Sequence, residues 1–256
     1  MNSTFKDWRA IALFFGMAYA IAWAAWITLF VLRLSHLAGV GICLYLLAVL
    51  APHGAAVAVT TLESGRAGLR DFYARVFRGA PIRWLVISLV VPPGLYLVSQ
   101  LIAVTVQMPH ESFFHQPPRT LPILILGLSA VALGEEPGWR GFALPRLAQK
   151  CGPITGSLIL GLAWSLWHLP LFMIAGTAQY GTPFLPFLGT LTAWSVLVAL
   201  IMGRARGSVV VAMLFHASAN LSDFTMWHPD AWPLTVGPWI GAATLAAWLM
   251  RRDLVI

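Results

Sequence analysis

The chain has 256 residues, of which 59% are hydrophobic and only 10% are charged, and its formal net charge is +7. A soluble domain carries about 25% charged residues, so this composition excludes a soluble globular protein and indicates a polytopic membrane protein. The basic residues are scattered rather than clustered with aromatics, which argues against nucleic acid as a partner.

Long continuous apolar runs favour a bundle of transmembrane helices over a β-barrel, whose strands alternate in polarity over about ten residues. We predict an all-α fold, with residues 1–256 forming one transmembrane domain of about eight helices in the lipid bilayer. Because a span needs roughly 20 residues, the fourth and seventh look short. The expected spans are 11–32, 37–61, 84–106, 121–136, 154–175, 185–202, 208–221 and 234–250. We expect a kink at Pro52 and an interruption of the third span at Pro92 and Pro93.

The distribution of basic residues predicts the orientation in the membrane. With the N-terminus in the cytoplasm and eight spans, thirteen of the sixteen Lys and Arg residues fall on the cytoplasmic side. Arg33 and Arg119 would lie outside, and Arg140 is assigned to the candidate site. We therefore predict that both the N-terminus and the C-terminus are cytoplasmic.

The two longest loops differ in character. In the loop 63–83, apolar side chains recur at helical spacing with arginines between them, which predicts an amphipathic helix at the inner membrane surface, most simply a topology anchor. The loop 107–120 contains Pro117 and Pro118 and is expected to be irregular. The apolar residues of the amphipathic segment are Leu69, Phe72, Tyr73, Val76 and Phe77.

Two adjacent carboxylates, Glu135 and Glu136, end an apolar run that contains no other charge. An ionisable group at membrane depth is costly and is by default a functional-site hypothesis. Arg140 follows Glu136 by one helical turn, so we predict a salt bridge between them and expect Glu135 to face a cavity as a general base. Taken without the later motifs, these residues are explained equally well as a charge cluster at the membrane interface that caps a helix.

The dipeptide Pro137-Gly138 follows the two acids. Proline is tolerated in the first turn of a helix but breaks an interior turn. We therefore expect the chain to bend here and a new helix to run over residues 138–149.

Two later spans contribute imidazoles. His168 lies deep in the fifth span, one turn after Trp164, whose ring could wall the imidazole and fix its rotamer. His216 and Asn220 are one turn apart in the seventh span and share a face, so they can direct two donors to one point, as an oxyanion hole requires. In isolation, each is also explained by hydrogen bonds between helices.

Together these groups can activate water and stabilise a tetrahedral oxyanion. The main alternative is a metal, because Glu135, His168 and His216 could bind Zn²⁺ with an open position for water. The chain contains no His-Glu-x-x-His motif, so we favour direct carboxylate catalysis and predict no metal and no other cofactor. Straight spans would separate Glu135 and His168 in depth by up to ~10 Å, so this hypothesis requires bent or shifted helices.

Three motifs occur in order on separate helical segments, Glu135-Glu136-x-x-x-Arg140, Trp164-x-x-x-His168 and His216-x-x-x-Asn220. In this pattern the chain resembles the CPBP family, the CAAX protease and bacteriocin-processing intramembrane endopeptidases. The resemblance covers about residues 121–220, and we expect the family-like catalytic core at about 121–222. The family usually has Phe at the position of Trp164.

The resemblance implies a glutamate-dependent intramembrane endopeptidase, similar to the type II CAAX prenyl endopeptidases. By analogy, Glu135 with His168 would activate the water, and His216 with Asn220 would hold the oxyanion. The supporting residues would be Glu136, Arg140 and Trp164.

The expected substrate is a membrane-associated peptide or protein. We expect an integral protein of the bacterial cytoplasmic membrane, where prenylated CAAX proteins are not expected and where relatives are linked to peptide processing and bacteriocin immunity. Two alternatives are a catalytically silent immunity or scaffold protein and a small proton-coupled transporter. The chain shows no paired halves with broken helices, which disfavours the transporter.

Overall fold

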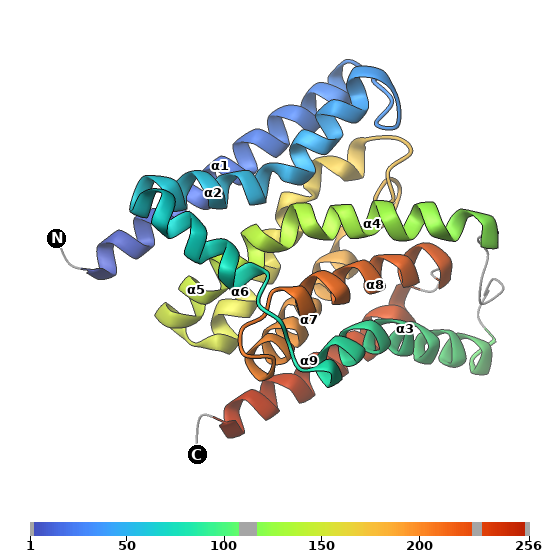
Figure 1. The fold of residues 1–256 in the computed structure, drawn as a ribbon. Helices are drawn as coiled ribbons and strands as arrows, with labels where there is room; N and C mark the ends of the chain where they lie inside the picture. Colours follow the sequence, from blue (N-terminus) through green and yellow to red (C-terminus); the bar gives the residue numbers. More distant parts are fainter. Residues whose placement is uncertain (1–2, 108–116, 227–231, 254–256) are drawn as a thin grey trace.

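The computed structural model describes residues 3–107, 117–226 and 232–253. All regular secondary structure in these ranges is helical, which confirms the predicted all-α fold (Figure 1). The α-helices are α1 (Ser3–Val31), α2 (Gly39–Val76), α3 (Ile82–Thr105), α4 (Leu121–Glu136), α5 (Leu144–Cys151), α6 (Pro153–Trp167), α7 (Phe184–Arg204), α8 (Val210–Met226) and α9 (Trp232–Asp253). The shorter segments are the 3₁₀ turns η1 (Pro118–Thr120) and η3 (Leu169–Met173) and the π-helix η2 (Pro137–Ala143).

Six helical stretches within the described residues are long and apolar enough to cross a membrane. Large apolar side chains on these stretches, such as Leu50, Ile123 and Leu126, are exposed, as contact with lipid requires. The chain is therefore an integral membrane protein, with α8 and α9 at the positions of the seventh and eighth predicted spans. The six stretches are Trp8–Val31, Gly39–Val76, Ile82–Thr105, Pro118–Cys151, Pro153–Met173 and Phe184–Arg204.

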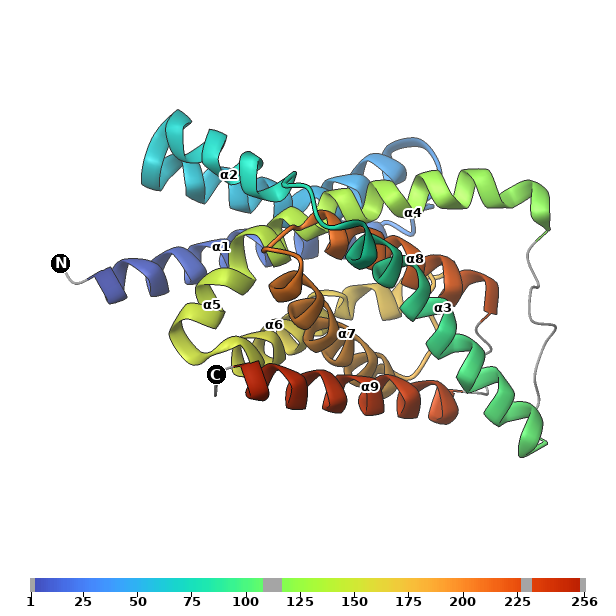
Figure 2. The same ribbon diagram turned by 60° about the horizontal axis from the view of Figure 1, so that its bottom comes forward.

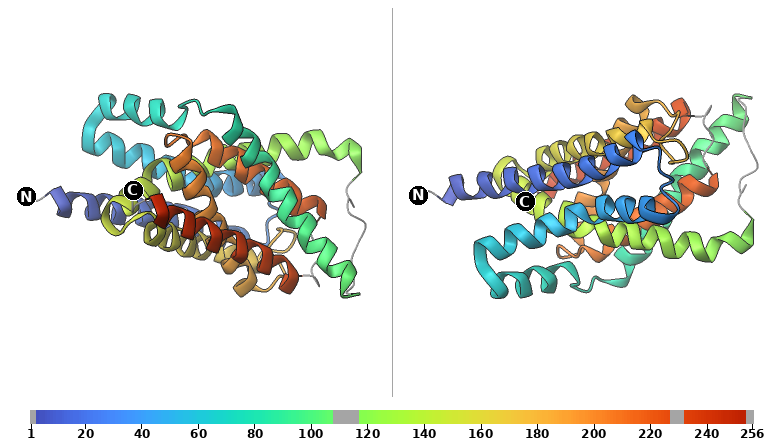
Figure 3. Two further views of the ribbon diagram at one scale, coloured as in Figure 1. Left: turned by 90° about the horizontal axis from the view of Figure 1, so that it is seen from below. Right: turned by 90° about the horizontal axis from the view of Figure 1, so that it is seen from above.

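Helices α1, α4 and α9 run roughly along one long axis, α3 and α7 cross it obliquely, and α1 to α4 run alternately in opposite directions (Figure 2). The start of α1 and the end of α9 lie at the same end of the bundle, as both views in Figure 3 show. Helix α1 packs against α2, α3 packs against α8, and α7 packs against both α6 and α9. Segments far apart in the sequence thus face one another inside one bundle.

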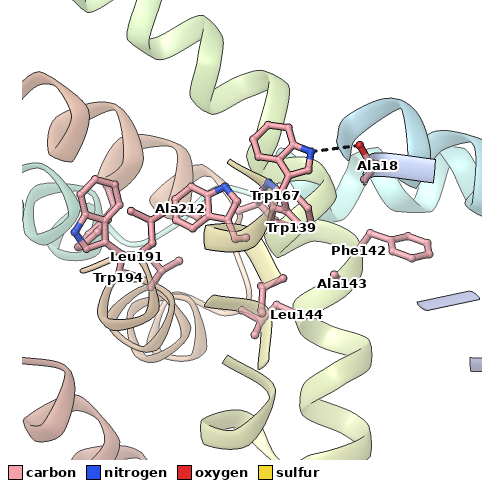
Figure 4. Packing of buried hydrophobic residues seen from close by; sticks show 14 of the residues in the cluster. Ala18, Trp139, Phe142, Ala143, Leu144, Trp167, Leu191, Trp194 and Ala212 are labelled. Carbon is pink, nitrogen blue, oxygen red and sulfur yellow. Dashed lines mark hydrogen bonds between the residues drawn. The ribbon is translucent and has the colours of Figure 1, made fainter. Parts of the chain in front are cut away.

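Helix α7 lies in the interior. Every residue from 193 to 198 is buried, which places protein on all sides of this helix. Figure 4 shows Trp194 of α7 and Trp139 of η2 in the buried hydrophobic cluster. In the same cluster, the indole N–H of Trp167 in α6 donates to the carbonyl of Ala18 in α1 at 3.3 Å. The core therefore connects the first helix to the second half of the chain.

The predicted start of a new helix at Gly138 is wrong, although the chain does change direction between α4 and α5 (Figure 2). Pro137 has helical φ and ψ of −56° and −38°, and the chain stays helical through η2 and α5 as far as Cys151. A proline inside a helix lacks an N–H and crowds the preceding turn, and the wider π-helical turn makes room for it.

The predicted interruption of the third span is also wrong, because α3 continues through Pro92 and Pro93. Pro93 has no N–H to offer the carbonyl of Leu89, one turn earlier. The Ser218 hydroxyl of α8 donates to that carbonyl at 2.8 Å. A neighbouring helix thus satisfies the backbone group that the proline leaves open, which is how membrane helices accommodate proline.

Helix α2 departs from helical geometry at Gly65, where φ is 57° and ψ is −153°, rather than at Pro52. The predicted amphipathic segment follows as a separate helical portion after this break. Phe72 and Val76 are fully buried, and a Cβ placed on Gly141 would lie 3.0 Å from Val76. The apolar face of the segment thus covers η2. Of the loop 107–120, which was predicted to be irregular, residues 108–116 lie outside the described residues. The 3₁₀ turn η1 lies in the described part that follows them.

Candidate active site

Two glycines let the segment that carries the acidic pair lie directly on α2. A Cβ on Gly134 would lie 3.2 Å from the Val49 side chain, and a Cβ on Gly138 would overlap the carbonyl of Pro52. Small residues four apart allow two membrane helices to approach closely. Glu135 and Glu136 stand between these glycines, so this contact sets the position of both carboxylates.

Glu136 accepts two hydrogen bonds on one oxygen. Arg140 NH1 donates to Glu136 Oε1 at 3.0 Å, and His216 Nδ1 lies 2.8 Å from the same atom. Both carboxylate and guanidinium are 1% exposed, which confirms the predicted salt bridge and places it in the protein interior. Because Oε1 acts as an acceptor, Nδ1 of His216 carries the hydrogen. Arg140 NH2 also donates to the hydroxyl of Ser195 in α7 at 3.1 Å.

Glu135 has a different partner. The indole N–H of Trp164 in α6 donates to Glu135 Oε2 at 2.8 Å, and both residues are buried. Within the described part of the chain, Oε1 of Glu135 accepts no hydrogen bond. One oxygen of this carboxylate is therefore held, and the other is available to a water or a substrate.

The tautomer of His168 follows from its hydrogen bond. Its Nδ1 lies 2.8 Å from the backbone carbonyl of Trp164, and a carbonyl oxygen only accepts. Nδ1 therefore carries the hydrogen, and in the neutral ring Nε2 presents its lone pair. The ring sits at the end of α6, where it packs edge-on against Trp167 at 4.8 Å and Phe187 at 5.2 Å between centroids.

Trp164 contacts Glu135, Arg140 and both imidazoles. The Arg140 guanidinium carbon lies 4.2 Å from the centre of its ring, a cation–π contact. Its ring centroid is 5.6 Å from that of His168 and 5.2 Å from that of His216. Glu135 and His168 are thus connected through a single residue, which bonds the first through its indole and the second through its backbone carbonyl.

Asn220 lies on α8, one turn after His216, and is half-buried. Its side chain makes no hydrogen bond within the described residues, unlike the rest of the predicted group. The structure therefore links Glu135, Glu136, Arg140, Trp164, His168 and His216 by direct contacts and leaves the Asn220 amide available.

Two comparisons with known proteins agree with this arrangement. The sequence model described as type II CAAX prenyl endopeptidase Rce1-like matches residues 117–222. The protein named CAAX prenyl protease 2 of Methanococcus maripaludis is 25% identical over 225 residues, which cover 82% of this chain and 83% of that protein. The chain is thus similar to type II CAAX prenyl endopeptidases over a central stretch and, at lower identity, over most of its length.

These similarities confirm the resemblance to type II CAAX prenyl endopeptidases. All three motifs fall inside the matched range. The six apolar helical stretches among the described residues place the chain in a membrane. The similarities and the apolar helices together support a membrane-embedded peptidase.

Sequence reasoning missed Ser195, whose hydroxyl accepts a hydrogen bond from the Arg140 guanidinium. The sequence gives little signal for it, because Ser195 is one of three hydroxyl residues in the apolar α7, with Thr190 and Thr192. Many such serines bond only to their own helix, as Ser165 does to Gly161. No group of three or more His, Cys, Asp or Glu side chains suited to a metal ion occurs among the described residues.

Proposed function

We propose that the chain hydrolyses a peptide bond of a membrane-associated peptide or protein, with Glu135 and His168 activating the water. The observation that carries this proposal is the double role of Trp164. Its indole N–H holds one oxygen of Glu135, and its carbonyl fixes the tautomer of His168. A free carboxylate oxygen and a free imidazole lone pair are the two acceptors that a nucleophilic water requires.

In this proposal His216 and Asn220 stabilise the oxyanion of the tetrahedral intermediate. His216 holds Glu136 through Nδ1, so Nε2 is the nitrogen that would face the substrate. If Nε2 also donates, the ring is a cation, and the Glu135 and Glu136 carboxylates together would balance the charges of His216 and Arg140. Two donors that converge on one developing oxyanion lower the barrier more than either does alone.

Glu136, Arg140 and Trp164 would support the site without touching the substrate. The Glu136 carboxylate and the Arg140 guanidinium neutralise one another inside the bundle, and the Ser195 hydroxyl fixes the second arm of the guanidinium. Residues that orient the reacting groups in this way provide the preorganisation on which catalysis depends. We place the catalytic core at about residues 121–222 of a single domain.

We propose that no metal or other cofactor takes part, with Zn²⁺ as the alternative. We place the protein in the bacterial cytoplasmic membrane with both termini in the cytoplasm, because that orientation puts most of the basic residues inside. The name of the relative from Methanococcus maripaludis refers to prenylated CAAX substrates. A useful substrate library therefore contains C-terminally prenylated peptides beside unmodified membrane peptides.

The test is cleavage of that library by purified wild-type protein and by Glu135→Gln, which keeps an acceptor for Trp164 but removes the base. We expect cleavage by the wild type, its loss in Glu135→Gln, and no effect of a strong chelator. Cleavage that the chelator abolishes and Zn²⁺ restores would instead identify a metalloprotease. A wild type that cleaves nothing favours the immunity or scaffold alternative, and a proton flux lost in Glu135→Gln favours the transporter.

A further inference from the structure

We propose that the indole N–H of Trp164 is a positioning donor for the base, holding Glu135 so that its second oxygen meets the water. This inference rests on the proposed function and assigns to Trp164 a role beyond that of an aromatic wall. A phenyl ring at this position could wall His168 but could not donate to Glu135.

The hydrogen bond has the geometry of a strong one. The distance from Trp164 Nε1 to Glu135 Oε2 is 2.8 Å, and the two residues are 1% and 3% exposed. A hydrogen bond to a carboxylate shielded from water contributes more than one between neutral groups. Since Oε2 is engaged and Oε1 is not, this bond decides which oxygen is left for the water.

The ring itself is held from several sides, so its N–H points to one place. The Arg140 guanidinium covers it at 4.2 Å, and that guanidinium is fixed in turn by Glu136 at 3.0 Å and by Ser195 at 3.1 Å. The rings of His168 and His216 contact it nearly edge-on. A chain of contacts from α7 through η2 to α6 therefore ends on the Glu135 carboxylate.

Burial of an indole does not by itself demand this bond. Trp26, Trp139, Trp194 and Trp239 are also buried, and their Nε1 atoms have no partner within the described residues. Trp194 lies next to Trp164, with ring centroids 6.2 Å apart (Figure 4 shows Trp194). Trp164 and Trp194 thus form a matched pair for comparison. The indole N–H of Trp164 donates a hydrogen bond, and that of Trp194 has no acceptor within the described residues.

The experiment replaces only the N–H. Benzothienylalanine, in which sulfur takes the place of the indole nitrogen, is introduced at position 164 and, as a control, at position 194 by nonsense suppression. The substrate is the library peptide that the wild type cleaves fastest, and kcat and KM are measured separately. Trp164→Phe serves as a second variant, and thermal unfolding in detergent confirms that each protein is folded.

We expect kcat to fall roughly 10- to 100-fold at position 164, the loss that follows from removing one hydrogen bond to a charged group. KM should stay within about twofold, because the bond acts on the base and not on substrate binding. The analogue at position 194 should leave both constants unchanged, and Trp164→Phe should repeat the fall in kcat.

An unchanged or increased kcat at position 164, or an equal fall at position 194, would overturn the inference. The proposed function is tested separately in the same assay by Glu135→Gln. If the wild type cleaves and Glu135→Gln does not, the function stands and only position 164 decides the inference. If the wild type cleaves nothing, both proposals fall together.

Discussion

The Nδ1 atom of His216 lies 2.8 Å from Oε1 of Glu136, the same oxygen that receives the guanidinium of Arg140 at 3.0 Å. The carboxylate therefore joins α8 to the π-helix η2 in the protein interior. Because one oxygen serves two donors, removing the carboxylate or either donor should disturb the others. This relationship leads to the first prediction.

Arg140→Met should destabilise the protein by about 3–5 kcal/mol, because it leaves the Glu136 charge buried without a cation. The double variant Glu136→Gln with Arg140→Met should recover much of that loss, since it removes both charges. The measurement is chemical or thermal unfolding in detergent, followed by circular dichroism. As a control, Glu63→Gln removes the partly exposed bridge to Arg146 and should cost less than about 1 kcal/mol. Equal losses in Arg140→Met and Glu63→Gln would contradict the prediction.

Gly138→Ala should destabilise the protein by about 1–3 kcal/mol and reduce cleavage, because the new Cβ would overlap the Pro52 carbonyl and push η2 away from α2. The matched control is Gly127→Ala in α4, where no atom lies within 4 Å of an added Cβ and alanine favours the helix. Unfolding temperature and cleavage rate are measured for both. The explanation fails if Gly138→Ala behaves like Gly127→Ala.

Ser195→Ala should destabilise the protein by about 1–3 kcal/mol, because the second arm of a buried guanidinium loses its acceptor. Ser88→Ala is the comparison, since Ser88 is equally buried but donates only to Trp84 of its own helix. Such bonds back to the helix add little to stability. Unfolding in detergent should therefore separate the two variants, and a larger effect of Ser88→Ala would argue against the role given to Ser195.

Tyr96→Phe should loosen the contact between α3 and α8, because the Tyr96 hydroxyl donates to Asp223 Oδ1 at 2.7 Å. The expected loss is about 1.5–3 kcal/mol, as for a hydrogen bond to a charged group. A double-mutant cycle with Asp223→Asn measures the coupling energy between the two side chains. Tyr180→Phe, at a residue that is 53% exposed, is the control. A coupling energy of zero would show that the contact contributes nothing.

The fold class and the positions of the helices could be predicted because hydropathy and span length are properties of the sequence alone. The effect of the prolines could not. Whether such a proline breaks a helix depends on groups from other helices, such as Ser218, which satisfies the carbonyl that Pro93 leaves open. A sequence read one segment at a time contains no information on those partners.

The same limit applies to the candidate site. The Glu136–Arg140 bridge was predicted from its one-turn spacing and is confirmed. The bond from Trp164 to Glu135 was not predicted, because it depends on how α6 and α4 are rotated relative to one another. The contact between His216 and Glu136 was missed for the same reason, since α8 lies far along the chain from η2. Spacing reveals partners on one helix, and packing selects those on different helices.

The two bonds of Trp164 respond differently to replacement of its side chain. Its carbonyl belongs to the backbone, so any amino acid at position 164 that keeps the helix can still accept from His168. Its indole exists only in tryptophan, so the link to Glu135 is lost in every other residue type. Exchange between Phe and Trp at this position would therefore change how the Glu135 carboxylate is held, and it would leave the hydrogen bond of the His168 imidazole intact. A substitution at this position can therefore change the activity while the other contacts of the site remain in place.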